Sequence, residues 1–251
     1  LNFDLLYGLP LQTTESVILS AKLAASLRPD RVSAFGYAHV PWFAKHQKAI
    51  NENDLPGIEE RFDQFYAIVE TLESEGYTAI GLDHFARNDD PLAKAARTGA
   101  LKRNFQGYTD DACDTLIAIG PSGISETPSG YLQNEKNTRI WSEAVERGDL
   151  TITRGAPVNR EDQLRRAVIE RLMCDLTVDV GNICSVYGFS VDYLDGSFDA
   201  INALEKDGLC ALSERTVTIP TDARILMRTV AQCFDAYAGQ QSSTPRHARA
   251  V

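Results

Sequence analysis

Two patterns of apolar residues alternate along the first half of the chain. Short apolar runs are typical of buried strands, and longer segments with apolar residues every three or four positions are typical of helices. Strands are predicted at residues 2–7, 31–37, 78–82 and 115–119. Helices are predicted around residues 17–24, 58–72, 91–98 and 138–147. Strands separated by helices pair in parallel through crossovers, so the sequence predicts an α/β fold with functional residues after the carboxyl ends of its strands.

Residues that start and stop helices support this assignment. Asp90 is a typical N-cap, Pro91 fits the first helical position, and Gly99 follows the last turn of the same segment. Gly76 and Gly148 stand just past the ends of two other predicted helices. The helices are therefore predicted with defined ends.

The second half has short helical segments and few strand signals. Asn159 is the N-cap of a helix whose buried face carries Leu164, Val168 and Leu172. Thr221 is the expected cap of the last helix. Short helices are expected at 180–187 and 198–206, and a hairpin at 210–212 and 217–219. This order is winged-helix-like. The predicted domains are 1–155, a helical domain at 156–240 and a flexible tail at 241–251.

Composition and charge narrow the class of protein. The chain has 251 residues, 43% of them hydrophobic and 24% charged, as in ordinary globular proteins. No apolar run reaches the roughly 20 residues that a membrane helix needs. The net charge of −10 argues against nucleic-acid binding. The winged-helix-like part is acidic as well, because segment 180–240 has four basic and eight acidic residues. A nucleic-acid-binding module is therefore disfavoured, and no nucleic-acid partner is expected.

Cysteine spacing excludes a metal centre of the usual kinds. The five cysteines are scattered, and the nearest two lie ten positions apart: Cys113, Cys174, Cys184, Cys210 and Cys233. No pair has the spacing of zinc or iron–sulfur ligands, so no metal ligand is assigned. Few cysteines in odd number favour a reducing cytoplasm over a disulfide framework. A cytoplasmic location is therefore expected.

The segment Arg103–Thr109 is the strongest candidate binding loop. It combines two aromatic residues with polar residues and a glycine, a mixture that suits neither a core strand nor a solvated loop. Phe105 offers a ring for stacking on a flat ligand, and Gln106 offers hydrogen bonds to a carboxylate or amide. Arg103 and the neighbouring Lys102 add positive charge.

Other candidates lie in or after the predicted strands. Asp4 lies among apolar residues, where a buried carboxylate needs a hydrogen-bonding partner such as a ligand or a neighbouring strand's Arg or Lys. His39 follows the second strand and either binds a substrate or bonds to a loop carbonyl. Asp83 and His84 point to opposite faces if the third strand continues, so they form no dyad with each other. Two interpretations stay open for this pair: a capping Asp beside a surface His, or a functional role.

Three stretches carry a resemblance to a known family. They are Tyr37–Pro41, Gly81–Ala86 and Arg103–Thr109, together with the run D-L-L-Y-G-L-P-x-Q-T that begins at Asp4. The chain resembles the oxygen-independent coproporphyrinogen III oxidases, radical S-adenosylmethionine enzymes of haem biosynthesis. The likeness is dense from Leu1 to about Cys174. It implies the latter half of an incomplete parallel TIM-like barrel, followed by the helical, winged-helix-like domain.

The resemblance implies a reaction and roles for individual residues. S-adenosylmethionine is cleaved to a radical that takes hydrogen from two propionates of coproporphyrinogen III, which lose carbon dioxide and become vinyl groups. The likeness assigns cofactor contacts to Asp4, Ala38 and Ile124, with two S-adenosylmethionine molecules per enzyme. It assigns active-site roles to Phe105 and Gln106. Substrate binding is expected at Arg103 and His39.

The resemblance also implies a part that this chain lacks. The family holds a [4Fe–4S] cluster with a C-x-x-x-C-x-x-C motif, which is absent here, so the chain is interpreted as the C-terminal part of a longer enzyme. The expected partners are the missing N-terminal half of the barrel, the porphyrinogen and an unidentified electron donor or acceptor. Consecutive Arg165 and Arg166 point about 100° apart on a helix, so at most one faces the pocket.

One further interpretation comes from the same superfamily. Haem chaperones keep the barrel and bind haem without decarboxylation. They share the Gly-Leu-Pro-x-Gln-Thr stretch but carry a His-Asn-x-x-Tyr-Trp pattern in place of the Arg103–Thr109 stretch, and they lack Asp-His-Phe-Ala. The stretches present in this chain therefore favour the oxidase.

Overall fold

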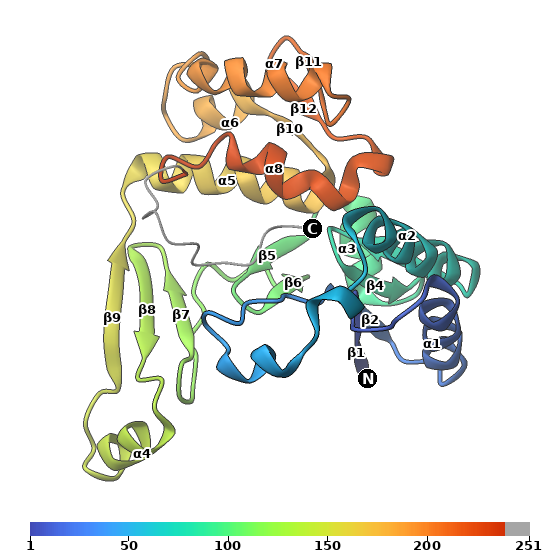
Figure 1. Ribbon diagram of the computed structural model, residues 1–251. Helices are drawn as coiled ribbons and strands as arrows, with labels where there is room; N and C mark the ends of the chain where they lie inside the picture. The colour runs from blue at the N-terminus through green and yellow to red at the C-terminus, as the bar shows by residue number, and fades with distance from the viewer. Residues whose placement is uncertain (239–251) are drawn as a thin grey trace.

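A four-stranded sheet forms the centre of the N-terminal half in the computed structural model, which describes residues 1–238 (Figure 1). Its strands, in spatial order, are β1 (Asn2–Tyr7), β2 (Arg31–Gly36), β4 (His84–Arg87) and β3 (Tyr77–Ile80). β1 and β2 pair in parallel, whereas β4 runs antiparallel to both β2 and β3. The predicted strand at 78–82 corresponds to β3, and the expectation that it pairs in parallel is wrong, because it forms an antiparallel hairpin with β4, a strand that was not predicted.

Two helices cover one face of this sheet. They are α1 (Thr14–Ser26) and α2 (Ile58–Ser74). Phe65 and Leu72 of α2 pack with Val32 and Phe85 of the sheet, and none of the four is more than 1% exposed. Burying each of these side chains contributes about 1.5–3 kcal/mol. The predicted helices at 17–24 and 58–72 are confirmed.

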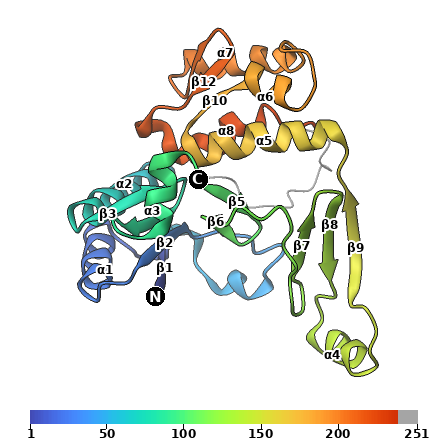
Figure 2. The same ribbon diagram turned by 180° about the vertical axis from the view of Figure 1, so that it is seen from behind.

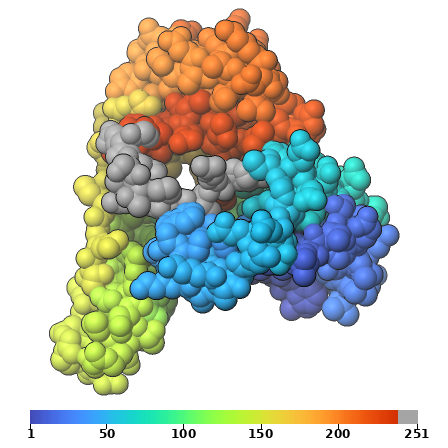
Figure 3. Space-filling model, viewed as in Figure 1, coloured from blue at the N-terminus to red at the C-terminus, as the bar shows by residue number. Residues whose placement is uncertain are grey.

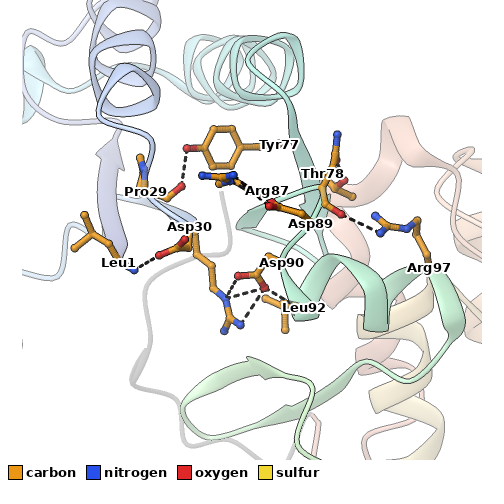
Figure 4. Close-up of polar contacts among 12 residues, drawn as sticks. Leu1, Pro29, Asp30, Tyr77, Thr78, Arg87, Asp89, Asp90, Leu92 and Arg97 are labelled. Carbon is orange, nitrogen blue, oxygen red and sulfur yellow. Dashed lines mark hydrogen bonds and ion pairs between the residues drawn. The ribbon is translucent and has the colours of Figure 1, made fainter.

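The short helix α3 (Pro91–Thr98) is fixed at both ends as its sequence predicts. Asp90 accepts a hydrogen bond from the backbone N–H of Leu92 at 2.7 Å, and its carboxylate also pairs with Arg31 of β2 at 3.0 Å (Figure 4). Gly99 adopts the left-handed conformation after the last turn. Tyr77 donates to the carbonyl of Pro29 at 2.7 Å, which ties β3 to the start of β2.

The predicted strand at 115–119 is wrong. This segment makes one isolated bridge, between Leu116 and Glu126, and Ile117 and Ile119 are 68% and 92% exposed. The reason is local hydrogen bonding. The backbone N–H of Ala118 donates to the hydroxyl of Ser125 at 3.0 Å, so a side chain takes the place of a neighbouring strand.

A hairpin and a three-stranded sheet follow α3, and no strand of either was predicted. The hairpin consists of β5 (Lys102–Asn104) and β6 (Gly107–Thr109). The antiparallel sheet consists of β7 (Ile124–Thr127), β8 (Gly130–Asn134) and β9 (Ile152–Pro157). Helix α4 (Thr138–Glu146) connects β8 to β9 and lies at the end of this projecting arm (Figures 1 and 2).

The C-terminal part is built around α5 (Arg160–Asp175), on which Leu164, Val168 and Leu172 are fully buried. The further helices and strands are β10 (Thr177–Asp179), α6 (Val180–Val186), α7 (Phe198–Lys206), β11 (Ala211–Ser213), β12 (Thr216–Thr218) and α8 (Met227–Gln232). Short 3-10 helices occupy Lys45–Ala49, Glu52–Asp54, Asp195–Ser197 and Thr221–Leu226. The predicted helices and hairpin of this part are confirmed. Thr221 is not the cap of the last helix, because a 3-10 turn that follows Pro220 precedes α8.

The C-terminal part packs back onto the N-terminal sheet. Arg224 donates to the carbonyl of Gly81 at 3.1 Å, Tyr66 donates to the carbonyl of Asp222, and Ile225 joins the core beneath the sheet. Figure 3 shows the C-terminal helices as the upper part of the molecule, above both the arm and the N-terminal half. The domain boundary near residue 155 stays a prediction, and the predicted tail lies outside the described residues.

Candidate functional site

A row of polar residues crosses the sheet on the face opposite α1 and α2. Asp4 of β1 pairs in register with Ser33 of β2, and Ser33 pairs with His84 of β4. Residues paired across neighbouring strands project to the same face, so the three side chains lie side by side. Asp4 is exposed and accepts a hydrogen bond from Asn2 at 2.7 Å. The expectation that Asp4 is buried is therefore wrong, because β1 is an edge strand.

Asp83 and His84 form a pair, contrary to expectation. Asp83 Oδ1 lies 2.7 Å from His84 Nδ1, and the two side chains are 15% and 18% exposed. Asp83 lies in the turn before β4, so the alternation of a strand does not apply to it. Arg228 of α8 approaches the other carboxylate oxygen of Asp83 at 3.9 Å.

Tyr108 fixes the β5–β6 hairpin between the sheet and α5. Its hydroxyl donates to the carbonyl of Met173 and accepts from the backbone N–H of Leu82, both at 3.0 Å. Its ring lies edge-to-face with the ring of His84, with centroids 5.2 Å apart. Burial raises the pKa of Tyr108 to about 12. A Cβ on Gly81 would stand 2.0 Å from the Tyr108 ring, so this close approach requires glycine.

The turn of this hairpin presents the residues that the sequence singled out. Phe105 is 55% exposed and lies edge-to-face with Tyr131 at 5.0 Å. Gln106 is exposed, and its backbone N–H donates to the side chain of Asn104 at 2.8 Å. Gly107 has φ of +127° and lies against the imidazole of His84. The side chains of Phe105 and Gln106 are thus available to a ligand rather than folded into the core.

Arg103 lines an open cavity of about 330 Å³ between the hairpin and α5. Its guanidinium lies 5.6 Å from the centroid of the Tyr108 ring, and no carboxylate pairs with it within residues 1–238. The other cations of the cavity are paired: Arg166 with Glu126 at 2.8 Å, and Lys102 with Glu170 at 3.6 Å. Burial raises the pKa of Glu126, which the charge of Arg166 opposes.

The two consecutive arginines of α5 face different surroundings. Arg166 lines the cavity, whereas Arg165 pairs with Glu161 at 2.8 Å and donates to the carbonyl of Phe234 at 3.1 Å. Arg166 is therefore the one of the two that reaches the cavity.

The loop after β2 holds His39 through both ring nitrogens. Nδ1 lies 3.2 Å from the hydroxyl of Tyr37, and Nε2 lies 3.3 Å from Glu52. Ala38 is exposed, and its carbonyl accepts from Gln47 at 3.0 Å. A substrate-binding role for His39 would require one of these two contacts to be exchanged, and that role stays a prediction.

Ile124 lies apart from the other expected cofactor contacts. It is the first residue of β7, pairs with Gln133 and is half-buried. Its sheet lies on the other side of the β5–β6 hairpin from the sheet that carries Asp4, which Ala38 follows in the loop after β2 (Figures 1 and 2). The structure therefore brings His84 and the hairpin turn together but leaves Ile124 on a separate element.

Tyr108 and the Asp83–His84 contact were missed from the sequence. A usable signal was Gly107, since short hairpin turns favour glycine, and a turn there places Tyr108 on a strand. No three His, Cys, Asp or Glu side chains group as a metal site in the described part of the chain, and no helix there is long and apolar enough to cross a membrane.

Comparison with known proteins gives a consistent result. No family model matches the chain. The chain is 41% identical over all 251 residues to an oxygen-independent coproporphyrinogen III oxidase of Bradyrhizobium diazoefficiens and 37% identical to that of Escherichia coli, covering 55% of each. The solved structure of the coproporphyrinogen III oxidase from Escherichia coli, described as a radical SAM enzyme, matches with a TM-score of 0.86 and 39% identity. This match covers 94% of the chain and 55% of the solved one.

The chain spans about half the length of the curated relatives that it matches. The relatives named here are oxidases, and none supports the haem-chaperone interpretation. The chain is therefore homologous, over its whole length, to about half of an oxygen-independent coproporphyrinogen III oxidase.

Proposed function

We propose that this chain is the latter part of a coproporphyrinogen III oxidase that converts two propionate side chains of coproporphyrinogen III to vinyl groups. The observation that carries the proposal is the exposed turn with Phe105 and Gln106, which lies against His84 on the sheet face that also bears Asp4. Homology over the whole chain supports the same reaction.

We also propose that a larger barrel continues from β1. β1 pairs in parallel with β2 and is an edge strand among the described residues, and α1 together with its C-cap exposes three leucines at intervals of four residues. Leu19, Leu23 and Leu27 are 59%, 59% and 67% exposed. A free strand edge beside an apolar stripe is costly in water and suits a further strand and helix. The order of α5, β10, α6, α7 and the β11–β12 hairpin supports a winged-helix-like C-terminal domain.

The residues of this chain fit S-adenosylmethionine on the open sheet face. The exposed carboxylate of Asp4 suits an ammonium or ribose hydroxyl groups, and exposed Ala38 leaves room beside the backbone. When bound, the cofactor supplies the radical that removes hydrogen from a propionate. The residues present do not fit an iron–sulfur cluster, so its ligands are proposed to belong to the remaining part of the enzyme. Two cofactor molecules and the Ile124 contact are part of this proposal.

The chain's own residues are proposed to bind and orient the porphyrinogen. Arg103 has no carboxylate partner among residues 1–238 and suits a propionate. Phe105 offers an exposed ring to a pyrrole, and Gln106 offers an amide beside it. Each propionate that reacts loses one hydrogen atom, one electron and carbon dioxide. Removing the carboxylate lowers the negative charge opposite Arg103, which favours release of the product.

Anaerobic assay of the full-length protein tests this function. We expect conversion of coproporphyrinogen III to protoporphyrinogen IX with formation of 5′-deoxyadenosine. The Gln106→Ala variant is expected to lose most product formation and to keep the melting temperature of the parent, because the side chain is exposed. Gln232→Ala, an exposed glutamine on α8, is the matched control. Stoichiometric haem binding without any decarboxylation would overturn the proposal.

A further inference from the structure

The Asp83–His84 pair is a group of titratable side chains to which the proposed function assigns no role. We propose that Nε2 of His84 is a hydrogen-bond acceptor for a neutral N–H group of the bound ligand, and that this group is a pyrrole N–H of the porphyrinogen. The inference rests on the proposed function and adds a residue that recognises the macrocycle rather than its propionates.

Asp83 determines which ring nitrogen is free. Its carboxylate lies 2.7 Å from Nδ1, and a carboxylate can only accept, so the proton of a neutral imidazole is held on Nδ1. Nε2 then carries a lone pair and acts as an acceptor. Arg228 lies 3.9 Å from the other carboxylate oxygen. The N–H of Ala34 donates to the backbone carbonyl of Asp83 at 2.8 Å and fixes the backbone from which the carboxylate projects.

The imidazole is fixed in orientation yet lacks a partner on Nε2. Phe35 and Tyr108 contact it edge-to-face, with ring centroids at 6.0 and 5.2 Å. Within residues 1–238 no group bonds to Nε2, and the side chain is 18% exposed. A ligand that covers this face would leave the acceptor buried and unsatisfied unless the ligand itself supplies a donor.

Nε2 of His84 lies beside the turn that carries the proposed substrate contacts. It would stand 3.3 Å from a Cβ on Gly107, the residue that follows Phe105 and Gln106. Glycine at this position keeps the approach to Nε2 free. A ligand held by the exposed ring of Phe105 therefore lies within reach of His84.

The chemistry of the acceptor favours the porphyrinogen over the cofactor. A pyrrole is a neutral ring with one N–H donor and no acceptor of its own, which matches a neutral imidazole nitrogen. The ammonium of S-adenosylmethionine suits a carboxylate better, and the exposed Asp4 lies in register on the same face. The pyrrole N–H of the porphyrinogen is therefore assigned to His84, and the ammonium of S-adenosylmethionine to Asp4.

The experiment compares His84→Leu and His84→Gln in the full-length protein, where Gln restores an acceptor near the place of Nε2. We expect His84→Leu to raise KM for coproporphyrinogen about ten- to hundredfold, and His84→Gln to recover most of this loss. The affinity for S-adenosylmethionine, measured by equilibrium dialysis, is expected to stay within twofold in both variants. An unchanged KM in His84→Leu, or a loss confined to cofactor affinity, would overturn the inference.

A second measurement covers the case in which His84→Leu does not fold. N-methylcoproporphyrinogen, which lacks one donor, is expected to bind the parent protein at least tenfold more weakly than coproporphyrinogen, and His84→Gln is expected to keep this discrimination. Equal binding of the two compounds by the parent protein contradicts the inference. A parent protein that does not decarboxylate coproporphyrinogen refutes the proposed function instead, so the two failures are distinguishable.

Discussion

Replacing Tyr108 with Phe tests how the hairpin is held. The change removes one hydroxyl and keeps the ring, so the packing against His84 and Gly81 is preserved. Two partners lose a hydrogen bond of 3.0 Å, namely the carbonyl of Met173 and the N–H of Leu82. Met173 lies in the last turn of α5, where a carbonyl has no donor from its own helix.

The magnitude follows from the burial of these partners. A buried polar group left unpaired costs about 1–3 kcal/mol. The hydrogen bond to the Met173 carbonyl is buried, so the full cost of an unpaired group applies to that carbonyl. The hydrogen bond from the Leu82 N–H is partly buried, so only part of the cost applies to that N–H. We expect Tyr108→Phe to lower the free energy of unfolding by roughly 2–4 kcal/mol.

Urea denaturation of the purified protein at pH 7 measures this loss. Tyr131→Phe is the matched control, because its half-buried hydroxyl has only a 3.4 Å contact with Arg166. The control is expected to cost less than about 1 kcal/mol. The reasoning would be refuted if Tyr108→Phe cost no more than the control, since the hydroxyl would then not hold the hairpin to α5.

Two further predictions follow from burial. The pKa of Tyr108, raised from 10.0 to about 12, favours the neutral phenol in the folded state, so its contribution is complete below pH 10 and is lost as pH rises to 12. The difference in unfolding free energy between the parent and Tyr108→Phe should shrink by about 2–3 kcal/mol over that range, and a constant difference would contradict the assignment. Ile119→Asp should change the unfolding free energy by less than about 0.5 kcal/mol, because Ile119 is 92% exposed. A loss above about 2 kcal/mol would restore the predicted strand at 115–119.

Local signals predicted the helices well and the strand pairing less well. Asp90, Pro91 and Gly99 determine α3 through contacts within a few residues, which the sequence displays directly. The β3–β4 and β7–β8 hairpins pair strands of only four or five residues, which apolar runs do not reveal, and β9 joins β8 across the inserted helix α4. The apolar run at 115–119 was misleading, because the N–H of Ala118 donates to the hydroxyl of Ser125 instead of to a neighbouring strand.

The candidate site divides in the same way. The exposed Phe105 and Gln106 were found because aromatic and polar residues beside a turn glycine are unusual in a core. The contact between Asp83 and His84 was not found, because it depends on where β3 ends. Asp4 was expected to be buried by its apolar neighbours, yet its exposure is determined by its position in an edge strand.

The contacts of the turn between β3 and β4 have a consequence for the order of folding. Gly81 is held by Arg224, a residue 143 positions later, and Asp83 by Arg228. Contacts so distant in sequence form late, because closing a long loop costs entropy before any contact repays it. Synthesis from the N-terminus produces the strands of the sheet before residues 221–228. The contacts of Arg224 and Arg228 with this turn, which complete the surroundings of the Asp83–His84 pair, are therefore expected to be among the last to form.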